Sequence, residues 1–457
     1  MDKQKELGNQ SVIKLLVQYS LPAIIAMMVN SLYTTVDRMF IGRIPGIGSI
    51  AMSGVGMTMP ITYVVMGLGM LIGVGTAASI SIKLGAQKRG VAEKLLGNAV
   101  TLTIIISAIV TVLGLAFSGK ILSMLGTSEL TLKYATQFIN ILLAGTIFNI
   151  AGFALNQTIR SDGNPKIAMV TMLIGAITNI VLDPIFIFVF DLGIAGAAYA
   201  TVISQAVSTI FIIHYFTKGK SNLKIKKENL KLEKPLVLKI FAIGMAPCAM
   251  QIAASLVQVV SNSALIKNGG DDAVAAMAII SSISMIFLMP IFGLNQGSQP
   301  IVGFNYGAKK YIRVKQALLY PIIVATIICS VGAVLIQVFP EYAIKLFNDD
   351  PSLIKTGSIG IRIFLSMLPI IGFQIISSNY FQAVGKAKVA MFLSLLRQVI
   401  LLIPLLIILP NFWGLTGVWL AGAIADLVSS IVTGAFIVRE MKLLHKQEEA
   451  ELVADAI

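Results

Sequence analysis

The sequence predicts an all-α integral membrane protein with twelve transmembrane helices, and three observations support this fold class. Of the 457 residues, 56% are hydrophobic and only 12% are charged, whereas soluble domains usually carry about 25% charged residues. The charged residues lie between long apolar stretches, each near or above the ~20 residues that cross a bilayer as a helix. The order of these stretches also repeats about halfway along the chain, which indicates two related halves.

The expected spans follow directly from the apolar stretches. In chain order they are 15–40, 54–80, 95–117, 133–157, 167–190, 194–216, 240–266, 273–303, 317–339, 353–381, 389–410 and 415–438. The N-terminal sequence MDKQKELGNQS contains acidic residues, and the apolar run after it is too long for the hydrophobic region of a signal peptide. We therefore expect no cleavable leader.

The distribution of positive charge predicts the orientation of the protein in the cell membrane. Of the 35 Lys and Arg residues, 26 lie in the two terminal segments and in the connections after even-numbered spans. By the positive-inside rule both termini are then cytoplasmic. The net charge of +14 thus reflects membrane topology, and we expect no nucleic-acid partner. The basic segment 217–239 is expected to be a cytoplasmic linker that contacts anionic lipid.

Sequence similarity between the halves predicts the domain organisation. LGAQKRGVAEK (84–94) matches YGAKKYIRVKQ (306–316), and RSDGNPKIAM (160–169) matches QAVGKAKVAM (382–391). Six spans return the chain to its starting side, so both halves have the same orientation, related by a pseudo-twofold axis along the membrane normal. We expect an N-lobe at 1–216, the linker at 217–239, a C-lobe at 240–438 and a cytoplasmic tail at 439–457.

Several oxygen-bearing side chains lie within the spans of the first half, where ionisable groups are costly to insert. The candidates for a proton or cation site are Asp37, Asn156, Asn179, Asp183 and Thr201. Asn179 precedes Asp183 by one helical turn and so lies on the same face. Pro184 and Pro22 should each kink a span and free a carbonyl oxygen. Carboxylate, amide, hydroxyl and carbonyl oxygens suit H⁺ or Na⁺ better than a soft metal.

The second half shows which of these residues the fold itself does not need. In the repeat alignment Asn179 and Asp183 correspond to Leu401 and Leu405. Because the equivalent span lacks the acid, a purely structural role for Asp183 is disfavoured. In the second half Arg397 and Asp426 have opposite charges on adjacent spans, and we expect a salt bridge, with a role in substrate binding or gating as the alternative.

Neutral polar and flexible apolar side chains of spans 7 and 8 are candidates to line a substrate cavity. They are Gln251, Gln258, Met285, Phe287, Met289, Asn295 and Gln296. Methionine adapts to varied ligands, whereas the amides could equally hold helices together, and the sequence leaves both interpretations open. The chain has no phosphate-binding loop, paired-histidine metal motif or nucleophile elbow. We expect neither an enzyme nor a cofactor.

The chain resembles the multidrug and toxic compound extrusion (MATE) family, most closely its bacterial MepA-type branch. The resemblance covers about 10–440 and is carried by SLYTTVDRMFIG, GVGTAASISIKLGAQKRG, TNIVLDPIFIF and GLNQGSQPIVGFNYGAKKYIRVK. It implies the MATE/MOP fold and an antiporter, expected to be monomeric, that exports organic, often cationic and amphipathic, drugs in exchange for Na⁺ or H⁺. It also implies that Asp37, Asn179, Asp183 and Thr201 form the cation site, with Asn156 nearby.

Three functions remain to be separated. The first is the drug antiporter, and the second is a flippase or exporter of a lipid-linked or polar metabolite from the same superfamily. The third is a passive channel or membrane enzyme, which is disfavoured because the two halves are asymmetric and only the first has paired acids. The residues suit H⁺ and Na⁺ equally, so the coupling ion stays open.

Overall fold

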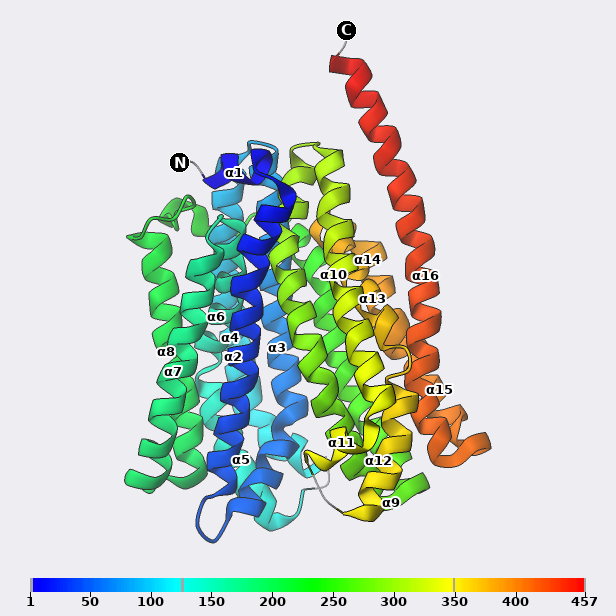
Figure 1. The fold of residues 1–457 in the computed structure, drawn as a ribbon. Helices are drawn as coiled ribbons and strands as arrows, with labels where there is room; N and C mark the ends of the chain where they lie inside the picture. Colours follow the sequence, from blue (N-terminus) through cyan, green and yellow to red (C-terminus); the bar gives the residue numbers. More distant parts are fainter. Residues whose placement is uncertain (1–2, 125–126, 348–349, 456–457) are drawn as a thin grey trace. The chain divides into compact units, whose positions relative to one another are not determined.

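The computed structural model describes residues 3–124, 127–347 and 350–455, and every regular element in this part of the chain is helical (Figure 1). Ten helices are long and apolar enough to cross a membrane, and two further helix pairs are bent by 55° and 49°. If each bent pair is one span, the number is twelve. Each expected span lies within one of these helices or pairs, or extends beyond it by no more than two residues. The predicted all-α membrane fold is confirmed.

The helices of the first half follow each other with short connections. They are α1 (Lys3–Asn9), α2 (Val12–Gly42), α3 (Gly48–Gly85), α4 (Arg89–Met124), α5 (Glu129–Ala144), α6 (Thr146–Ser161), α7 (Pro165–Pro184), the π-helix η1 (Ile185–Val189) and α8 (Gly193–Thr217). The short 3-10 helix η2 (Lys227–Leu230) lies in the linker. The bent pair of this half is α5 and α6.

The helices of the second half repeat this order. They are α9 (Lys234–Gly307), α10 (Tyr311–Val338), α11 (Pro340–Lys345), α12 (Pro351–Phe364), α13 (Leu368–Ala383), α14 (Ala387–Leu395), the π-helix η3 (Leu396–Leu402), α15 (Ile403–Ile408) and α16 (Pro410–Asp455). Gly270 breaks α9 and Gly414 breaks α16, each with a positive φ that glycine adopts without steric cost. The bent pair of this half is α12 and α13.

The backbone carries the duplication that the sequence predicts. Both boundaries of α6 and of α13 lie 222 residues apart, as do the ends of α3 and α9 and the starts of α7 and α14. Gln87 (φ 59°) and Lys309 (φ 60°) keep the same spacing, although left-handed backbone is uncommon for residues other than glycine. The two halves therefore share local geometry even where their side chains differ.

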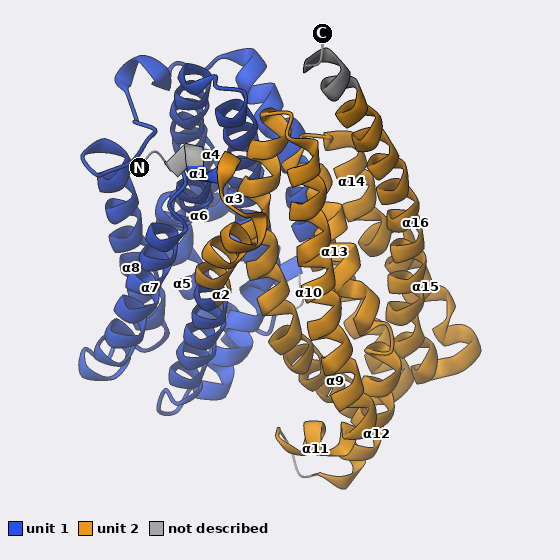
Figure 2. Ribbon diagram, turned by 45° about the horizontal axis from the view of Figure 1, so that its top comes forward, with its two compact units in different colours: residues 1–7, 25–252 blue, residues 8–24, 253–457 orange. Residues whose placement is uncertain are grey.

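The chain divides into two compact units (Figure 2). Unit 1 comprises Met1–Leu7 and Ile25–Ile252, and unit 2 comprises Gly8–Ile24 and Ala253–Ile457. Helix α2 passes from unit 2 to unit 1 after Ile24, and α9 passes from unit 1 to unit 2 after Ile252. The expected lobes, which divide the chain at the linker, stay a prediction.

Glycines explain why each unit includes the beginning of the other repeat. In unit 1 a Cβ atom on Gly75 would lie 2.1 Å from the carbonyl oxygen of Ile240. In unit 2 a Cβ atom on Gly297 would lie 2.4 Å from Ser20 Oγ. Gly75 and Gly297 are equivalent in the two repeats, and only glycine permits such close helix packing.

The linker is bound along the end of unit 1 by side chains of α4. The Asn98 side chain donates to the carbonyl oxygen of Lys231 (3.1 Å) and accepts from the backbone N–H of Glu233 (2.8 Å). Thr101 donates its hydroxyl to the carbonyl oxygen of Leu230 (2.7 Å). Because most of these contacts use the linker backbone, the segment has a defined path.

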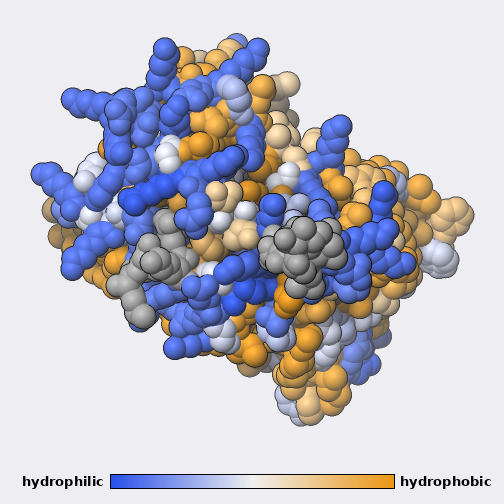
Figure 3. Space-filling model, turned by 90° about the horizontal axis from the view of Figure 1, so that it is seen from above, coloured by the Kyte–Doolittle hydropathy of each residue, from blue (hydrophilic) through white to orange (hydrophobic). Residues whose placement is uncertain are grey.

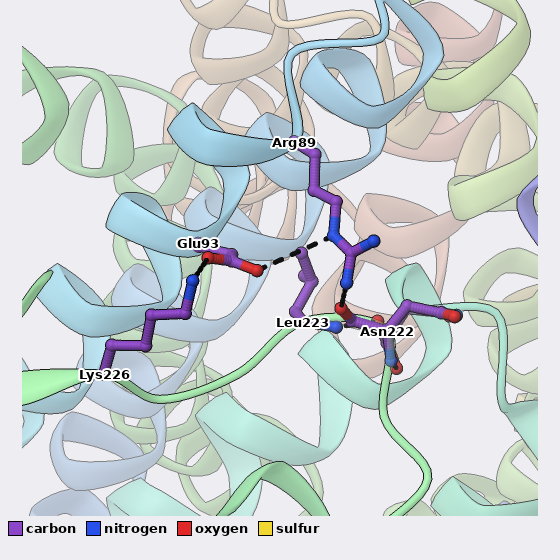
Figure 4. Close-up of polar contacts among 6 residues, drawn as sticks. Arg89, Glu93, Asn222, Leu223 and Lys226 are labelled. Carbon is purple, nitrogen blue, oxygen red and sulfur yellow. Dashed lines mark hydrogen bonds and ion pairs between the residues drawn. The ribbon is translucent and has the colours of Figure 1, made fainter.

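Charged residues continue this attachment (Figure 4). Arg89 donates to the carbonyl oxygen of Asn222, and Glu93 pairs with Arg89 at 3.6 Å and with Lys226 at 2.6 Å. Hydrophilic side chains are abundant on the face of the molecule shown in Figure 3.

Candidate functional site

The site begins with two acids in unit 1, on helices far apart in sequence. Asp37 lies five residues before the end of α2, and Asp183 is the penultimate residue of α7. Their carboxyl groups lie within hydrogen-bonding reach of each other. Asp183 has no exposed surface. Because two carboxylates have no donor between them, such a contact is favourable only when a proton or cation is shared.

Three oxygen atoms around this pair have no hydrogen-bond partner among the described residues. They are Asp37 Oδ1, Asn179 Oδ1 and Asp183 Oδ2, and all three are buried. The amide nitrogen of Asn179 donates to Asp183 Oδ1 at 3.2 Å, which leaves the amide oxygen free to accept. Buried oxygens without a partner are costly. The arrangement therefore suits a cation or an added proton.

Tyr33 is a further member of the site and was not predicted from the sequence. It lies one helical turn before Asp37 on α2, and its hydroxyl interacts electrostatically with both Asp37 and Asp183. The four-residue spacing in YTTVD could have indicated it, because residues i and i+4 share a helix face. Arg38, beside Asp37 in sequence, is exposed and provides a positive charge near that carboxyl.

The other two expected ligands have different surroundings. The Asn156 side chain donates to the carbonyl oxygen of Ala168 (2.8 Å) and to the hydroxyl of Thr171. Thr171 precedes Asp183 by twelve residues of α7, or about 18 Å of helical rise. The structure therefore does not bring Asn156 to the acid pair. Thr201 lies on α8, and its carbonyl oxygen accepts from Ser204 at 2.8 Å; among the described contacts its hydroxyl has no bond to either acid.

The two prolines differ in their effect on the helix. Pro22 lies inside α2, and the helix continues on both sides of it. Pro184 ends α7, and the next five residues form the π-helix η1. A π-helical turn is a rare departure that often accompanies functional sites. It lies directly after Asp183, so the backbone changes its winding beside the acid pair.

In unit 2 the expected charge pair is formed. Arg397 Nε donates to Asp426 Oδ1, which joins η3 to α16. Asp426 is only 2% exposed, and this contact gives its buried charge a positive partner. Arg397 also lies in a π-helix, at a different position along its span from η1.

The candidate cavity residues do not form one described group. Gln251 belongs to unit 1, where its amide contacts Met66 Sδ at 3.2 Å. Gln258 is exposed and donates to Asn262 at 2.9 Å. The remaining five lie in the part of α9 that belongs to unit 2. They are Met285, Phe287, Met289, Asn295 and Gln296.

These five residues also have separate surroundings. Met285 is 45% exposed, and the Phe287 ring packs against Gly332 of α10. Asn295 lines a small pocket together with Gln299, Asn379 and Tyr380. The role of the set in substrate binding stays a prediction.

The chain is a polytopic helical membrane protein with an acid pair inside unit 1, and its relatives are transporters and not enzymes. The family model described as MatE matches residues 22–185 and 247–408, which together make up more than half of the chain. The chain belongs to the MatE family. The resemblance noted in the sequence is confirmed.

Two curated relatives have similar length and carry the same printed name. The chain is 28% identical over 445 residues to the multidrug export protein MepA of Staphylococcus haemolyticus, covering 97% of each chain. It is 30% identical over 410 residues to MepA of Staphylococcus aureus strain MRSA252, covering 89% of each chain.

Solved structures share the fold. One is described as the outward-facing conformation of a multidrug resistance MATE family transporter of the MOP superfamily, with a TM-score of 0.90 and 25% identity over 96% of this chain and 98% of that one. A MOP superfamily transporter from Pyrococcus furiosus matches with the same values, and the reversed polarity of its binding pocket is said to suggest a different function. The MATE/MOP fold is therefore confirmed.

Proposed function

We propose that the protein is a secondary active multidrug exporter that moves organic, often cationic, compounds out of the cell in exchange for H⁺ or Na⁺. The observation that carries this proposal is the Asp37–Asp183 pair, two adjacent carboxyl groups inside unit 1. The printed name of the MepA relatives supports a drug-like substrate. The repeats at 1–216 and 240–438 act as the two lobes that alternate access.

Charge on the acid pair drives the proposed cycle. When H⁺ or Na⁺ is bound, the repulsion between the carboxylates and the cost of burying them both fall. When the ion leaves, uncompensated negative charge remains in a low-dielectric interior, which favours a state that admits water or an organic cation. Drug and coupling ion therefore oppose each other, by direct competition or by stabilising different states.

The position of the pair along the spans sets the path of the ion. Asp183 follows Pro165 by eighteen residues of α7, which correspond to about 27 Å of helical rise. The linker end of unit 1 faces the cytoplasm in the proposed orientation, because the excess of Lys and Arg lies on that side. The pair then lies toward the outer face, where it loads from the exterior.

The membrane potential makes coupling necessary. Exporting one positive charge against 100 mV, inside negative, requires about 2.3 kcal/mol. One entering monovalent cation releases the same amount. A second ion, or a neutral drug, allows a steeper outward gradient, and a site with two acids accommodates either stoichiometry.

The test is drug export in proteoliposomes with Asp183→Asn. This variant keeps the side-chain size and removes the charge, so gradient-driven export should fall by about tenfold or more. Asp191→Asn is the matched control, because Asp191 is exposed and its left-handed backbone (φ 52°) also suits asparagine. Normal export by folded D183N would contradict the proposal.

The coupling ion is identified by imposing pH and Na⁺ gradients separately. The contact between the two carboxyls is suited to a shared proton, whereas the three unpaired oxygens are suited to Na⁺. If only one of the two gradients drives drug export, and both Asp37→Asn and Asp183→Asn abolish that export, this gradient identifies the coupling ion. Export that responds to neither gradient argues against antiport.

A second candidate function is export or flipping of a lipid-linked or polar metabolite. It is favoured by the different function suggested for the Pyrococcus furiosus transporter, which has the same fold. Organic cations distinguish the two candidates, because they should stimulate ion flux through a drug antiporter. A complete lack of such stimulation, with export of polar compounds instead, would favour the second candidate.

A further inference from the structure

Arg160 is a buried positive charge in unit 1 that the proposed transport cycle does not use. It lies in the last turn of α6 and is 2% exposed. Its guanidinium donates to Gln157 Oε1 at 2.8 Å and contacts Met172 Sδ at 3.5 Å. Among the described residues no carboxylate oxygen lies within 4.0 Å of it. Burying a cation without a counter-charge is unfavourable, so its presence calls for an explanation.

The acid nearest in sequence does not compensate this charge. Asp162 directs its carboxylate to the linker, where it accepts from the backbone N–H groups of Asn222 (3.0 Å) and Leu223 (2.9 Å). It also accepts from the Tyr215 hydroxyl at 2.5 Å. Its oxygens are thus engaged away from Arg160.

Polar groups occur at intervals along α7 between the region of Arg160 and the acid pair. Asn156 contacts Thr171, one residue from Met172. Ser208 of α8 donates to the carbonyl oxygen of Thr171 at 3.0 Å, and a Cβ atom on Gly175 would lie 2.5 Å from Ser208 Oγ. Further along the helix are the buried Asn179 and Asp183.

We name this series the polar track and define it by Arg160, Asn156, Thr171, Ser208, Asn179 and Asp183. Met172 and Asp183 are eleven residues apart, or about 16 Å along α7. Arg160 therefore lies at the linker end of the track, and the acid pair lies at the other end. Polar groups within membrane spans mark the paths of protons and ions.

We propose that Arg160 closes the polar track to cations, so that ions bound at the acid pair do not leak through unit 1 to the linker end. A fixed positive charge without a counter-ion repels any cation that approaches along the track. This function requires the charge to stay uncompensated, which explains why no carboxylate faces the guanidinium. The inference rests on the proposed function, because it concerns ions at the same acid pair.

The experiment measures ion leak without drug. Proteoliposomes receive an inside-negative potential, and entry of H⁺ is followed with a trapped pH-sensitive dye, or entry of Na⁺ with a radioactive tracer. Arg160→Gln removes the charge and should raise the leak of at least one of these ions about tenfold or more. Arg160→Lys keeps the charge and should leak as little as the wild type.

A second pair of variants leaves Arg160 in place. Met172→Glu brings a carboxylate to the position of the Met172 sulfur, 3.5 Å from the guanidinium, and neutralises the barrier. It should leak, whereas Met172→Gln, which has the same length and no charge, should not. Met172→Glu should also melt at a higher temperature than Met172→Gln, because it pairs the buried charge. If Arg160→Gln does not fold, the comparison of Met172→Glu with Met172→Gln still tests the proposal.

The leak must also depend on the acid pair. Adding Asp183→Asn to Arg160→Gln or to Met172→Glu should abolish the extra leak. The proposal is overturned if folded Arg160→Gln and Met172→Glu leak no more than the wild type, or if the leak persists with Asp183→Asn. If the Arg160 and Met172 variants do not leak but drug export still requires Asp183, only this inference is wrong. If drug export does not require Asp183, the proposed function is wrong.

Discussion

Arg397 and Asp426 show at the residue scale how a buried charge pair depends on both partners. Asp426 is 2% exposed, and its contact with Arg397 joins η3 to α16. The desolvation of both charges offsets most of their attraction, so the intact pair adds little net stability. Replacement of only one of the two residues, however, leaves the other charge buried without compensation.

Arg397→Met should therefore destabilise unit 2 by about 3 kcal/mol. The double variant Arg397→Met with Asp426→Leu should recover most of this loss, because no unpaired charge remains. Thermal unfolding in detergent measures both effects. If the double variant is less stable than Arg397→Met alone, the pair has a role beyond mutual neutralisation.

The sequence predicted part of the site for a reason that applies to single residues. An acid within a span is costly, so Asp37 and Asp183 are conspicuous, and the structure places them together. Tyr33 did not stand out, because aromatic residues are common in spans. The expected span ended at residue 157, so Arg160 was placed in a connection. In the structure α6 continues to Ser161, four residues further, and includes Arg160.

At the scale of elements, close packing by glycine makes a specific prediction. Gly75→Ala should lower the melting temperature, because its Cβ atom would lie 2.1 Å from the carbonyl oxygen of Ile240. Gly56→Ala on the same helix is the control, since nothing lies within 4 Å of a Cβ atom there. The control should gain up to about 1 kcal/mol from helix propensity. Equal melting temperatures for the two variants would contradict the packing described here.

The attachment of the linker depends on Asp162, which lies between α6 and α7 outside the spans. Burial raises the pKa of this carboxyl to about 6, while hydrogen bonds from the Tyr215 hydroxyl and from the linker act in the opposite direction. In an unfolded chain the pKa is about 3.9. The folded protein therefore binds this proton more tightly than the unfolded chain.

The stability of the wild type should accordingly depend on pH through Asp162. The stabilising contribution of the protonated carboxyl is complete below about pH 4 and is lost as the pH rises through about 6, a change of about 3 kcal/mol. The measurement compares the melting temperatures of the wild type and Asp162→Asn from pH 4 to pH 7.5. The wild type should lose stability relative to the variant over this range, and a relative gain would show that the hydrogen bonds outweigh burial.

The linker has contacts that could not be predicted from the sequence. Its basic composition indicated a solvated connector, but composition carries no information about its backbone contacts. Asn98 and Thr101 bind carbonyl oxygens at Lys231 and Leu230, and any residue type could supply such oxygens. The spans were more predictable, because about twenty apolar residues in a row have few alternatives to a membrane helix.

At the scale of the whole molecule, the sequence repeats and the compact units divide the chain differently. The repeat spacing was visible in matched motifs, and the helix boundaries preserve it. The allocation of Gly8–Ile24 to unit 2 and of the chain up to Ile252 to unit 1 was not predictable. It depends on which helices approach closely in space, and the position of a glycine in the sequence does not show which helix packs against it.

The exchange of helix segments has a consequence for synthesis of the protein. Unit 1 lacks its last residues until the ribosome has made Ile252, although the first repeat is finished earlier. The nascent first repeat must therefore remain in the membrane with the surface around Gly75 uncovered until the beginning of α9 arrives. A gene fragment that encodes only the first repeat would leave that surface uncovered permanently, which makes its product a target for cellular quality control.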